Sequence, residues 1–295
     1  MVESINLLKA TRVYRTLQIL MAMMIPTAFA NTINKEVILL GISCILIYSA
    51  AGIHNAIRDK DYVMPLYSKK VMFTLLCAGL IISLSNHIIF FAAMAGILLG
   101  LSYNTFSRHI LFGDSTILAI THYTLPCFSA SLLLKQDVRL TVALTGFMFL
   151  TFWFLMHSKN LKDTEDDAKR GYKTLTTIGR NGKTISIMLL MPGFLSMFLA
   201  YFMFNLTNRF LAVFSIVFIL QAVAIKQIIS NENQSAVKLI RLLMMLFLFG
   251  IIIDRASSIK VILIPAFSFL SYLALLLTNS IAKEKYLKKA GVMSE

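Results

Sequence analysis

Long apolar runs separated by short polar gaps dominate the chain. Ten such runs can be read in the sequence, at 17–33, 37–57, 71–86, 88–105, 115–134, 140–157, 184–204, 210–228, 236–253 and 260–279. A helix needs roughly 20 apolar residues to cross the hydrocarbon core of a bilayer, and most of the runs approach that length. The third, fourth and ninth runs are short. The pattern therefore predicts an all-α, polytopic bundle with about nine to ten transmembrane helices.

Composition narrows the class of protein. Of the 295 residues, 58% are hydrophobic and only 14% are charged. A soluble domain with this composition would expose large apolar patches to water, so we expect one integral-membrane domain over residues 1–295. The net charge of +14 does not indicate binding to nucleic acid, because the cations lie in short gaps between apolar runs. The three cysteines stand singly within those runs and lack the spacing of a metal site.

The gaps differ in charge on the two sides of the predicted membrane. With a cytoplasmic N-terminus, that side holds 22 of the 28 Lys and Arg residues. The other side keeps Lys35, Lys135, Arg139, Arg209, Arg255 and Lys260. Basic loops favour the cytoplasm. We therefore expect a multi-pass protein of the cell membrane whose N-terminus and polar clusters face the cytoplasm.

Two acidic clusters follow the second and the sixth apolar run. The first contains Asn55 and Asp59, and the second contains Asp163 and Asp167. Residues four apart share one face of a helix, so each pair can line one wall of a pocket. Carboxylates gathered at a membrane edge beside Lys and Arg suit a divalent metal that holds a diphosphate. The alternative is a set of solvated loops whose acids balance nearby lysines.

Basic and aromatic residues extend this candidate site. The cations that flank the acids are candidates for direct contacts with phosphate: Arg58, Lys60, Lys162, Arg170 and Lys173. Tyr103 and Arg108 lie in or beside the gap after the fourth run, where they could contact a diphosphate or stabilise an allylic cation. Anchoring at the membrane interface is the alternative for this pair.

We predict a separate role for each of two polar residues of the fifth run. Asp114, at its start, is expected either to cap a helix N-terminus or to line the pocket. His122, inside the run, is expected to make a buried hydrogen bond.

The second cluster resembles a motif of the UbiA superfamily of intramembrane prenyltransferases. That motif has a D-x-x-x-D core followed by Gly and Thr, which Asp163, Asp167, Gly171 and Thr174 match. The segment from Tyr103 to Arg108 resembles the tyrosine-and-basic loop that follows the fourth span in this family.

The first cluster departs from its counterpart in that family, which is roughly N-D-x-x-D-x-x-x-D. Asn55 and Asp59 match, Ala56 and Val63 replace two acids, and Asp61 is an offset extra acid. These departures predict a weakened first metal site. They also predict that restoring an acid with Ala56→Asp leaves activity intact or raises it, unless the pocket has been rebuilt for another ligand.

The resemblance implies a helical bundle around a central cavity that opens to the bilayer. It implies Mg²⁺-dependent transfer of an isoprenoid chain from a prenyl diphosphate to an aromatic or other hydrophobic acceptor, as in lipid or quinone biosynthesis. Asp59, Asp163 and Asp167 would be the catalytic metal ligands, with Asn55 as a further metal ligand. A quinone-precursor aromatic, a glycerol-based lipid phosphate and a porphyrin-like alcohol remain open as acceptors.

Two other functions are compatible with the sequence. One is a family member that has lost catalysis and binds a lipid or a partner, which the altered first cluster favours. The other is a transporter, which would usually place ionisable residues near the middle of the membrane. The depth of the acids within the bundle distinguishes the transporter from the other two.

The charge asymmetry yields a prediction about topology. In a variant without the native cysteines, a cysteine replacing Lys162 is expected to react with an impermeant thiol reagent only from the cytoplasmic side. A cysteine replacing Lys135, in a gap on the opposite side, is the matched control. Labelling of position 162 from outside the cell would contradict the predicted orientation.

Overall fold

Helices make up all the regular structure in the part of the chain that the computed structural model describes. That part covers residues 2–59, 63–177 and 181–289, without the side chains of 2–5, 104, 163, 166 and 277–289. The α-helices are α1 (Val2–Ala10), α2 (Val13–Ala30), α3 (Lys35–Asp59), α4 (Ser68–Ser83), α5 (His87–Thr105), α6 (Gly113–Ala119), α7 (Leu125–Leu133), α8 (Val138–Met156), α9 (Ser158–Lys169), α10 (Gly182–Met203), α11 (Asn208–Ile229), α12 (Asn233–Arg255) and α13 (Ile259–Lys289). A 3₁₀ turn, η1 (Ser107–His109), and a π-helical turn, η2 (Ile120–Thr124), lie on either side of α6.

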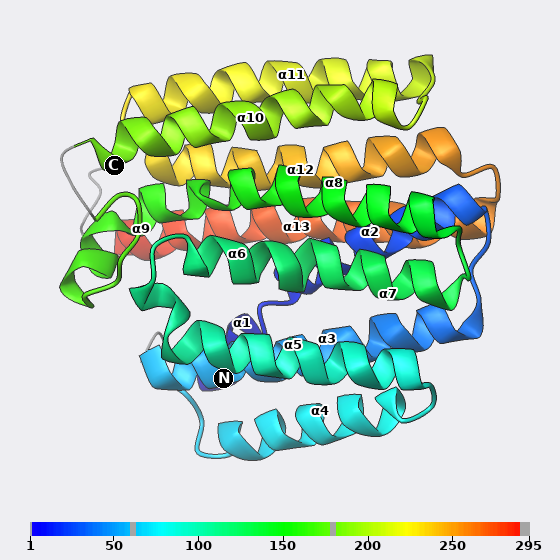
Figure 1. Cartoon of the computed structure of the whole chain (residues 1–295). Coiled ribbons are helices and arrows are strands. Elements are labelled where there is room, and N and C mark those ends of the chain that lie inside the picture. Colours follow the sequence, from blue (N-terminus) through cyan, green and yellow to red (C-terminus); the bar gives the residue numbers. More distant parts are fainter. Residues whose placement is uncertain (1, 60–62, 178–180, 290–295) are drawn as a thin grey trace.

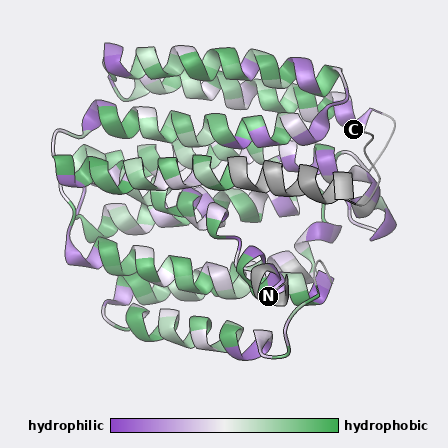
Figure 2. Cartoon of the chain, turned by 180° about the vertical axis from the view of Figure 1, so that it is seen from behind, coloured by the Kyte–Doolittle hydropathy of each residue, from purple (hydrophilic) through white to green (hydrophobic). Residues whose placement is uncertain are grey.

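The long helices run side by side as a bundle, with their connections at its two ends (Figure 1). Within the described residues, eight helical segments are long and apolar enough to cross a membrane, and the apolar part of α5 is shorter. Every predicted run is helical, which confirms the all-α prediction. The helices consist mainly of hydrophobic residues (Figure 2), and many large hydrophobic side chains, such as Phe73, Phe91 and Phe218, are exposed on the bundle. The chain is therefore an integral membrane protein.

Helix α2 lies at the centre of the bundle. In its 18-residue apolar window 67% of the residues are buried, against 28% in α11, which lies at the edge. The largest cluster of buried apolar residues joins α2 to α8, α10 and α12. Because lipid can cover an apolar helix as well as other helices do, the central place of α2 follows from side-chain packing and not from hydrophobicity alone.

The fifth run is interrupted by the π-helical turn η2 between α6 and α7. Pro126, at the start of α7, has no backbone N–H to donate, and a wider turn can accommodate that loss. The turn carries His122 and Tyr123 with their side chains buried inside the bundle. π-Helical turns are frequent at functional sites, and this one forms part of a cavity wall described below.

Two glycines permit close packing where the polar gaps lie. A Cβ on Gly52 of α3 would stand 2.5 Å from the carbonyl oxygen of Ala10 in α1. A Cβ on Gly113 of α6 would stand 2.4 Å from the carbonyl oxygen of Ser107 in η1. Both neighbours are backbone atoms, which cannot rotate away. The two glycines therefore let α1 lie against α3 and let α6 start beside η1.

Candidate functional site

The polar gaps after α3, α5 and α8 meet at one end of the bundle, where α9 lies (Figure 1). The backbone N–H of Lys173, which follows α9, donates to the carbonyl oxygen of Arg108 at 2.8 Å. The side chain of Lys173 is exposed. Segments that are far apart in the sequence therefore form one polar cluster, as the grouping of the acids predicts.

Asp59, the last residue of α3, is surrounded by guanidinium groups. Its carboxylate oxygens lie 2.8 Å from Arg58, 3.3 Å from Arg108 and 3.8 Å from Arg170. The Asp59 side chain is only 7% exposed, so these cations offset the cost of burying its charge. The structure thus brings the predicted residues Asp59, Arg58 and Arg108 together.

Arg108 connects Asp59 to two tyrosines. Its guanidinium carbon lies 4.5 Å from the ring centre of Tyr103 and 5.0 Å from that of Tyr172, and it donates a hydrogen bond to the Tyr172 hydroxyl at 3.1 Å. Burial would lower the pKa of Arg108, but Tyr103, Tyr172 and the Asp59 carboxylate raise it above its usual value. Arg108 is therefore a permanent cation at the centre of the cluster.

Lys159 of α9 forms a second buried ion pair beside the first. Its amine donates to the Tyr103 hydroxyl at 2.7 Å and lies 3.2 Å from the Asp114 carboxylate. Asp114 also accepts a hydrogen bond from the backbone N–H of Ser115. The expectation that Asp114 caps a helix is wrong, because the N-cap residue of α6 is Phe112. Asp114 instead fixes the position of Lys159 next to Tyr103.

Helix α9 carries the second acidic cluster, so Asp163 and Asp167 share one helical face. The side chain of Asp163 lies outside the described residues, whereas that of Asp167 is half-buried and that of Lys162 is exposed. Gly171 ends the helix with a φ of 69°. The backbone N–H of Tyr172 donates to the Asp167 carbonyl, which is the hydrogen bond of a Schellman cap. The glycine of the second motif therefore turns the chain so that Tyr172 reaches Arg108.

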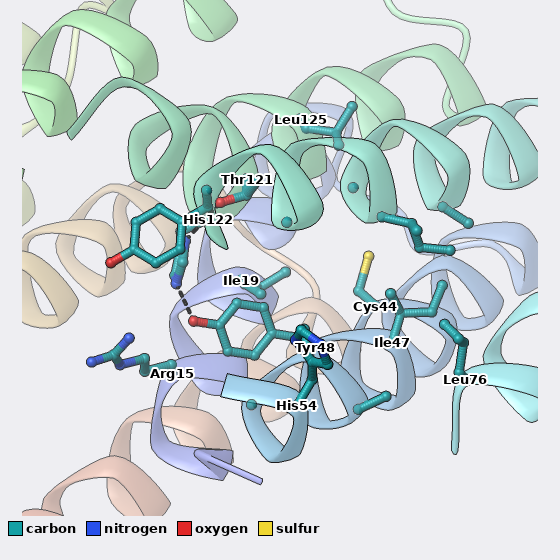
Figure 3. Close-up of a pocket in the computed structure, with 18 of the residues that line it drawn as sticks. Arg15, Ile19, Cys44, Ile47, Tyr48, His54, Leu76, Thr121, His122 and Leu125 are labelled. Carbon is teal, nitrogen blue, oxygen red and sulfur yellow. Dashed lines mark hydrogen bonds between the residues drawn. The ribbon is translucent and has the colours of Figure 1, made fainter. Parts of the chain in front are cut away.

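A cavity of about 340 Å³ lies beside this cluster, between α2, α3, α4, α5 and the α6–α7 segment. Its walls are mainly apolar, and its polar residues include Arg15, Tyr48, Asn55, Tyr103 and His122. In Figure 3 Arg15, Tyr48 and His122 lie together, away from Leu76. Ligand pockets have volumes of roughly 300–1,000 Å³, so the cavity is large enough for part of a hydrophobic ligand.

His122 has a fixed orientation in this cavity wall. Its Nε2 is 2.7 Å from the Tyr48 hydroxyl, and its Nδ1 is 3.0 Å from the carbonyl oxygen of Leu118. The carbonyl can only accept, so Nδ1 carries the proton and Nε2 accepts from Tyr48. The prediction of a buried hydrogen bond for His122 is confirmed.

Orphaned oxygen atoms indicate where a cation could bind. Asn55 and Asn160 are buried, and the Oδ1 atom of each lacks a hydrogen-bond partner. Such oxygens are ligands that Mg²⁺ accepts, together with carboxylates. No three His, Cys, Asp or Glu side chains gather around one point within the described residues, a set that does not include the side chain of Asp163. The oxygen donors present nevertheless fit a hard divalent cation held with a phosphate ligand.

The sequence patterns assigned no site role to three residues of the cluster: Lys159, Asn160 and Tyr172. For two of them, the spacing from the acids of the second cluster indicates a position in the site. Lys159 is four residues before Asp163, and Asn160 is seven residues before Asp167, so both fall near the face of α9 that carries the acids. No local pattern marked Tyr172, whose contact with Arg108 depends on the turn at Gly171.

The two positions that lack family acids have opposite environments. Ala56 is fully buried in an apolar cluster with Leu7, Ala10 and Ile53, whereas Val63 is 73% exposed. The structure therefore argues against the expectation that Ala56→Asp preserves or raises activity. Helix α1 packs where an acid at position 56 would need space and water.

The carboxylates of α3, α6, α8 and α12 lie near the ends of these helices, and those of the second cluster lie on α9, at one end of the bundle. Asp59 ends α3, Asp114 lies in the first turn of α6, and Asp254 is next to the end of α12. Glu36 lies in the first turn of α3, and Asp137 caps α8. This depth does not favour a transporter, which would place such groups near the middle of the membrane.

Comparisons with known proteins agree with this architecture. A family model, the UbiA prenyltransferase family, matches residues 68–251, a range that includes the second acidic cluster and begins after the first. No curated protein matches the sequence.

Three solved structures resemble the fold. A structure described as a digeranylgeranylglyceryl phosphate synthase in membranes has a TM-score of 0.63 at 18% identity, covering 88% of this chain and 100% of its own. An apo UbiA homolog from Aeropyrum pernix K1 has a TM-score of 0.65 at 13% identity, covering 82% and 98%. A UbiA homolog from Archaeoglobus fulgidus bound to Cd²⁺ has a TM-score of 0.55 at 16% identity, covering 91% and 98%.

The contrast between Ala56 and Val63 gives a prediction about stability. Ala56→Asp is expected to destabilise the protein by about 3 kcal/mol or more, because it buries a carboxylate without a partner. Val63→Asp is the matched control, and its carboxylate stays in water. Thermal unfolding in detergent measures both. Equal melting temperatures for the two variants would contradict the observed packing of α1 against α3.

Proposed function

This chain belongs to the UbiA prenyltransferase family, and from that premise we propose that it transfers an isoprenoid chain from a prenyl diphosphate to a hydrophobic or aromatic acceptor within the membrane. In the reaction, the bond between the first isoprenoid carbon and the diphosphate oxygen breaks. A nucleophilic carbon or oxygen of the acceptor then bonds to that carbon and loses its proton.

One observation carries the proposal: an apolar cavity adjoins a charged cluster, and Tyr103 belongs to both. Tyr103 lines the cavity, while its hydroxyl accepts from Lys159 and its ring contacts Arg108. A prenyl diphosphate has the same division, with an apolar chain and a polyanionic head. The boundary at Tyr103 is therefore suited to the reacting carbon between the two.

Arginines supply the proposed contacts to the diphosphate. Arg58, Arg108 and Arg170 converge on Asp59, and guanidinium groups bind phosphate oxygens in a bidentate manner. Lys162 and Lys173, exposed at the same end of the bundle, remain candidates for further phosphate contacts. A diphosphate that binds these arginines would release the Asp59 carboxylate, which could then bind a metal ion. We therefore expect metal binding and diphosphate binding to be strongly coupled.

The proposed metal ligands are Asp59, Asp163 and Asp167, with the orphaned Asn55 oxygen as a further donor. Mg²⁺ is the proposed metal, since it prefers a few carboxylates together with substrate phosphates. When bound, it would neutralise negative charge on the departing diphosphate.

The cavity protects the reacting carbon from water. Water rapidly traps an allylic cation, and the apolar cavity walls formed by α3, α5 and α6 would exclude water. The Tyr103 ring lies where its face could stabilise developing positive charge. We place this end of the bundle on the cytoplasmic face of the cell membrane, as the distribution of basic residues predicts.

A relative that binds lipid without catalysis is the second candidate. Two observations favour it: Asp59 has three guanidinium partners, and the family match begins after the first cluster. Incubation with labelled prenyl diphosphates of several lengths and a panel of acceptors, with and without Mg²⁺, separates the candidates. Metal-dependent product formation supports the transferase, and binding without turnover supports the relative.

Loss of either α9 carboxylate is expected to abolish turnover. Asp163→Ala and Asp167→Ala should each lower the rate by about 100-fold or more, because each removes a proposed ligand of the metal that would neutralise the departing diphosphate. Glu165→Ala is the matched control, since Glu165 is exposed on another face of the same helix. Size-exclusion profiles verify folding. Full activity of a well-folded Asp163 or Asp167 variant would remove the metal role from that residue.

The first cluster yields a second kinetic prediction. Asp59→Ala is expected to raise the Mg²⁺ concentration needed for half-maximal turnover by about 10- to 100-fold, and to be more damaging than Asp61→Ala. Asp61 itself lies outside the described residues. The measurement is turnover across a Mg²⁺ titration at fixed prenyl diphosphate. If Asp59→Ala is silent and the wild type binds no prenyl diphosphate, the non-catalytic relative becomes the better account.

A further inference from the structure

A chain of hydrogen bonds continues from Tyr103 past Lys159 and ends at His157. Beyond the Lys159–Asp114 ion pair, the Asp114 carboxylate accepts from the Ser115 hydroxyl at 3.2 Å. The same hydroxyl oxygen is 2.9 Å from the Nδ1 atom of His157, at the end of α8. Asp114, Ser115 and His157 are all buried. These five side chains form a relay that joins the end of α8 to α6, α6 to α9, and α9 to α5.

The direction of these hydrogen bonds follows from the single proton of the Ser115 hydroxyl. Asp114 is paired with Lys159 and has no proton to donate, so the Ser115 hydroxyl donates to the carboxylate. The Ser115 oxygen must then accept from His157, because its own proton is already used. His157 therefore carries a proton on Nδ1, while its Nε2 atom has no hydrogen-bond partner within the described residues.

Aromatic side chains hold the His157 ring in this orientation. The ring makes edge-to-face contacts with Phe112 and Trp153, whose ring centroids lie 5.4 Å and 5.0 Å from its own. The indole nitrogen of Trp153 in turn donates to the Thr116 hydroxyl of α6 at 2.9 Å. The Nδ1–H group of His157 is therefore held toward α6, where Ser115 lies.

The hydrogen bond from His157 decides which acceptor the Ser115 hydroxyl uses. A serine inside a helix can turn its hydroxyl back to a carbonyl oxygen of the preceding turn, which removes it from other partners. Donation from His157 occupies a lone pair of the Ser115 oxygen and leaves its proton directed at Asp114. One Asp114 oxygen is thus fixed by the hydroxyl and the backbone N–H of Ser115, and the other faces Lys159.

We propose that His157 is a positioning residue for prenyl transfer, whose Nδ1–H fixes the Tyr103 hydroxyl through the relay. This inference rests on the transferase function proposed above. His157 is not among the described residues that line the apolar cavity, so it acts on the reaction through the relay alone. Its effect falls at the boundary proposed for the reacting carbon, where a displacement of about 1 Å can slow a reaction by about 100-fold.

The alternative is that His157 only stabilises the end of α8. Such a role depends on the size and burial of the side chain, whereas positioning depends on one N–H group at the place of Nδ1. Asn and Gln separate the two roles, because both carry a neutral amide. The amide nitrogen of Asn lies near the position of Nδ1, and that of Gln lies nearer the position of Nε2.

Turnover of the purified full-length protein, with the prenyl diphosphate and acceptor that give product in the panel above, tests the proposal. His157→Gln is expected to lower kcat at least about tenfold and to change the KM for prenyl diphosphate less than about twofold, because the arginines around Asp59 are unchanged. His157→Asn is expected to lower kcat less than about threefold. His87→Gln, at the exposed start of α5, is the matched control and should keep the wild-type kcat. Equal losses in the Asn and Gln variants, or wild-type kcat in His157→Gln, would overturn the proposal.

Ser115→Ala tests the same relay at its next link. It is expected to lower kcat by about the same factor as His157→Gln, and the double variant should lose no more than either single variant, because both changes break one path. Thermal unfolding in detergent verifies that each variant folds. If His157→Gln does not fold, Ser115→Ala decides the matter. Wild-type kcat in Ser115→Ala, or losses that multiply in the double variant, would count against the relay.

A measurement without turnover separates this inference from the transferase proposal. In protein labelled with ¹³C at the tyrosine Cζ atoms, the Tyr103 resonance reports the hydrogen bonding of its hydroxyl, and Tyr103→Phe identifies that resonance. His157→Gln is expected to shift it, and His157→Asn to return it toward the wild-type position. An unshifted resonance in His157→Gln overturns the relay even in an active transferase. A shifted resonance in a protein that transfers no prenyl group leaves the relay standing, while the transferase and the role of His157 in it fail.

Discussion

The contacts of Arg108 hold together the helix ends that form the charged cluster. Its guanidinium pairs with Asp59 at the end of α3 and lies between the rings of Tyr103 and Tyr172. Its carbonyl oxygen accepts the N–H of Lys173, which follows α9. One cation thus links the three polar gaps of the chain. At the edge of an apolar bundle such a charge must be paired, so the arrangement of the cluster follows from satisfying Arg108 and Asp59 together.

The second constraint is the segregation of charge from the apolar cavity. Asp114 pairs with Lys159, and Lys159 donates to the Tyr103 hydroxyl, so these two contacts position Tyr103 at the boundary between the two regions. Rigid positioning suits transfer chemistry, in which the reacting carbon has to stay at that boundary while water is kept out. The same boundary would let a non-catalytic relative bind a lipid with an anionic head, which is why the decisive experiments measure turnover and binding separately.

The cations of the bundle are balanced differently in two places. Near Asp59 the cations are balanced by a carboxylate and are suited to exchange partners with a diphosphate. A smaller cavity is lined by Arg15, Gln18 and Arg241; its lining has no carboxylate, and the Gln18 Nε2 lacks a hydrogen-bond partner.

The sequence by itself determined the helices, their membrane setting and the gathering of acids at one end. Run length and the bias of basic residues are local properties, and a four-residue spacing fixes a shared helical face for Asp163 and Asp167 wherever the helix lies. Tertiary structure alone decided which side chains meet across helices. Arg15 and Arg241 are far apart in the sequence, and they line one cavity only because α2 and α12 pack together. The sequence indicates only that Ala56 replaces a metal ligand of the family, whereas the structure shows that α1 covers this residue. Burial depends on the neighbouring helices, so the local sequence could not predict it.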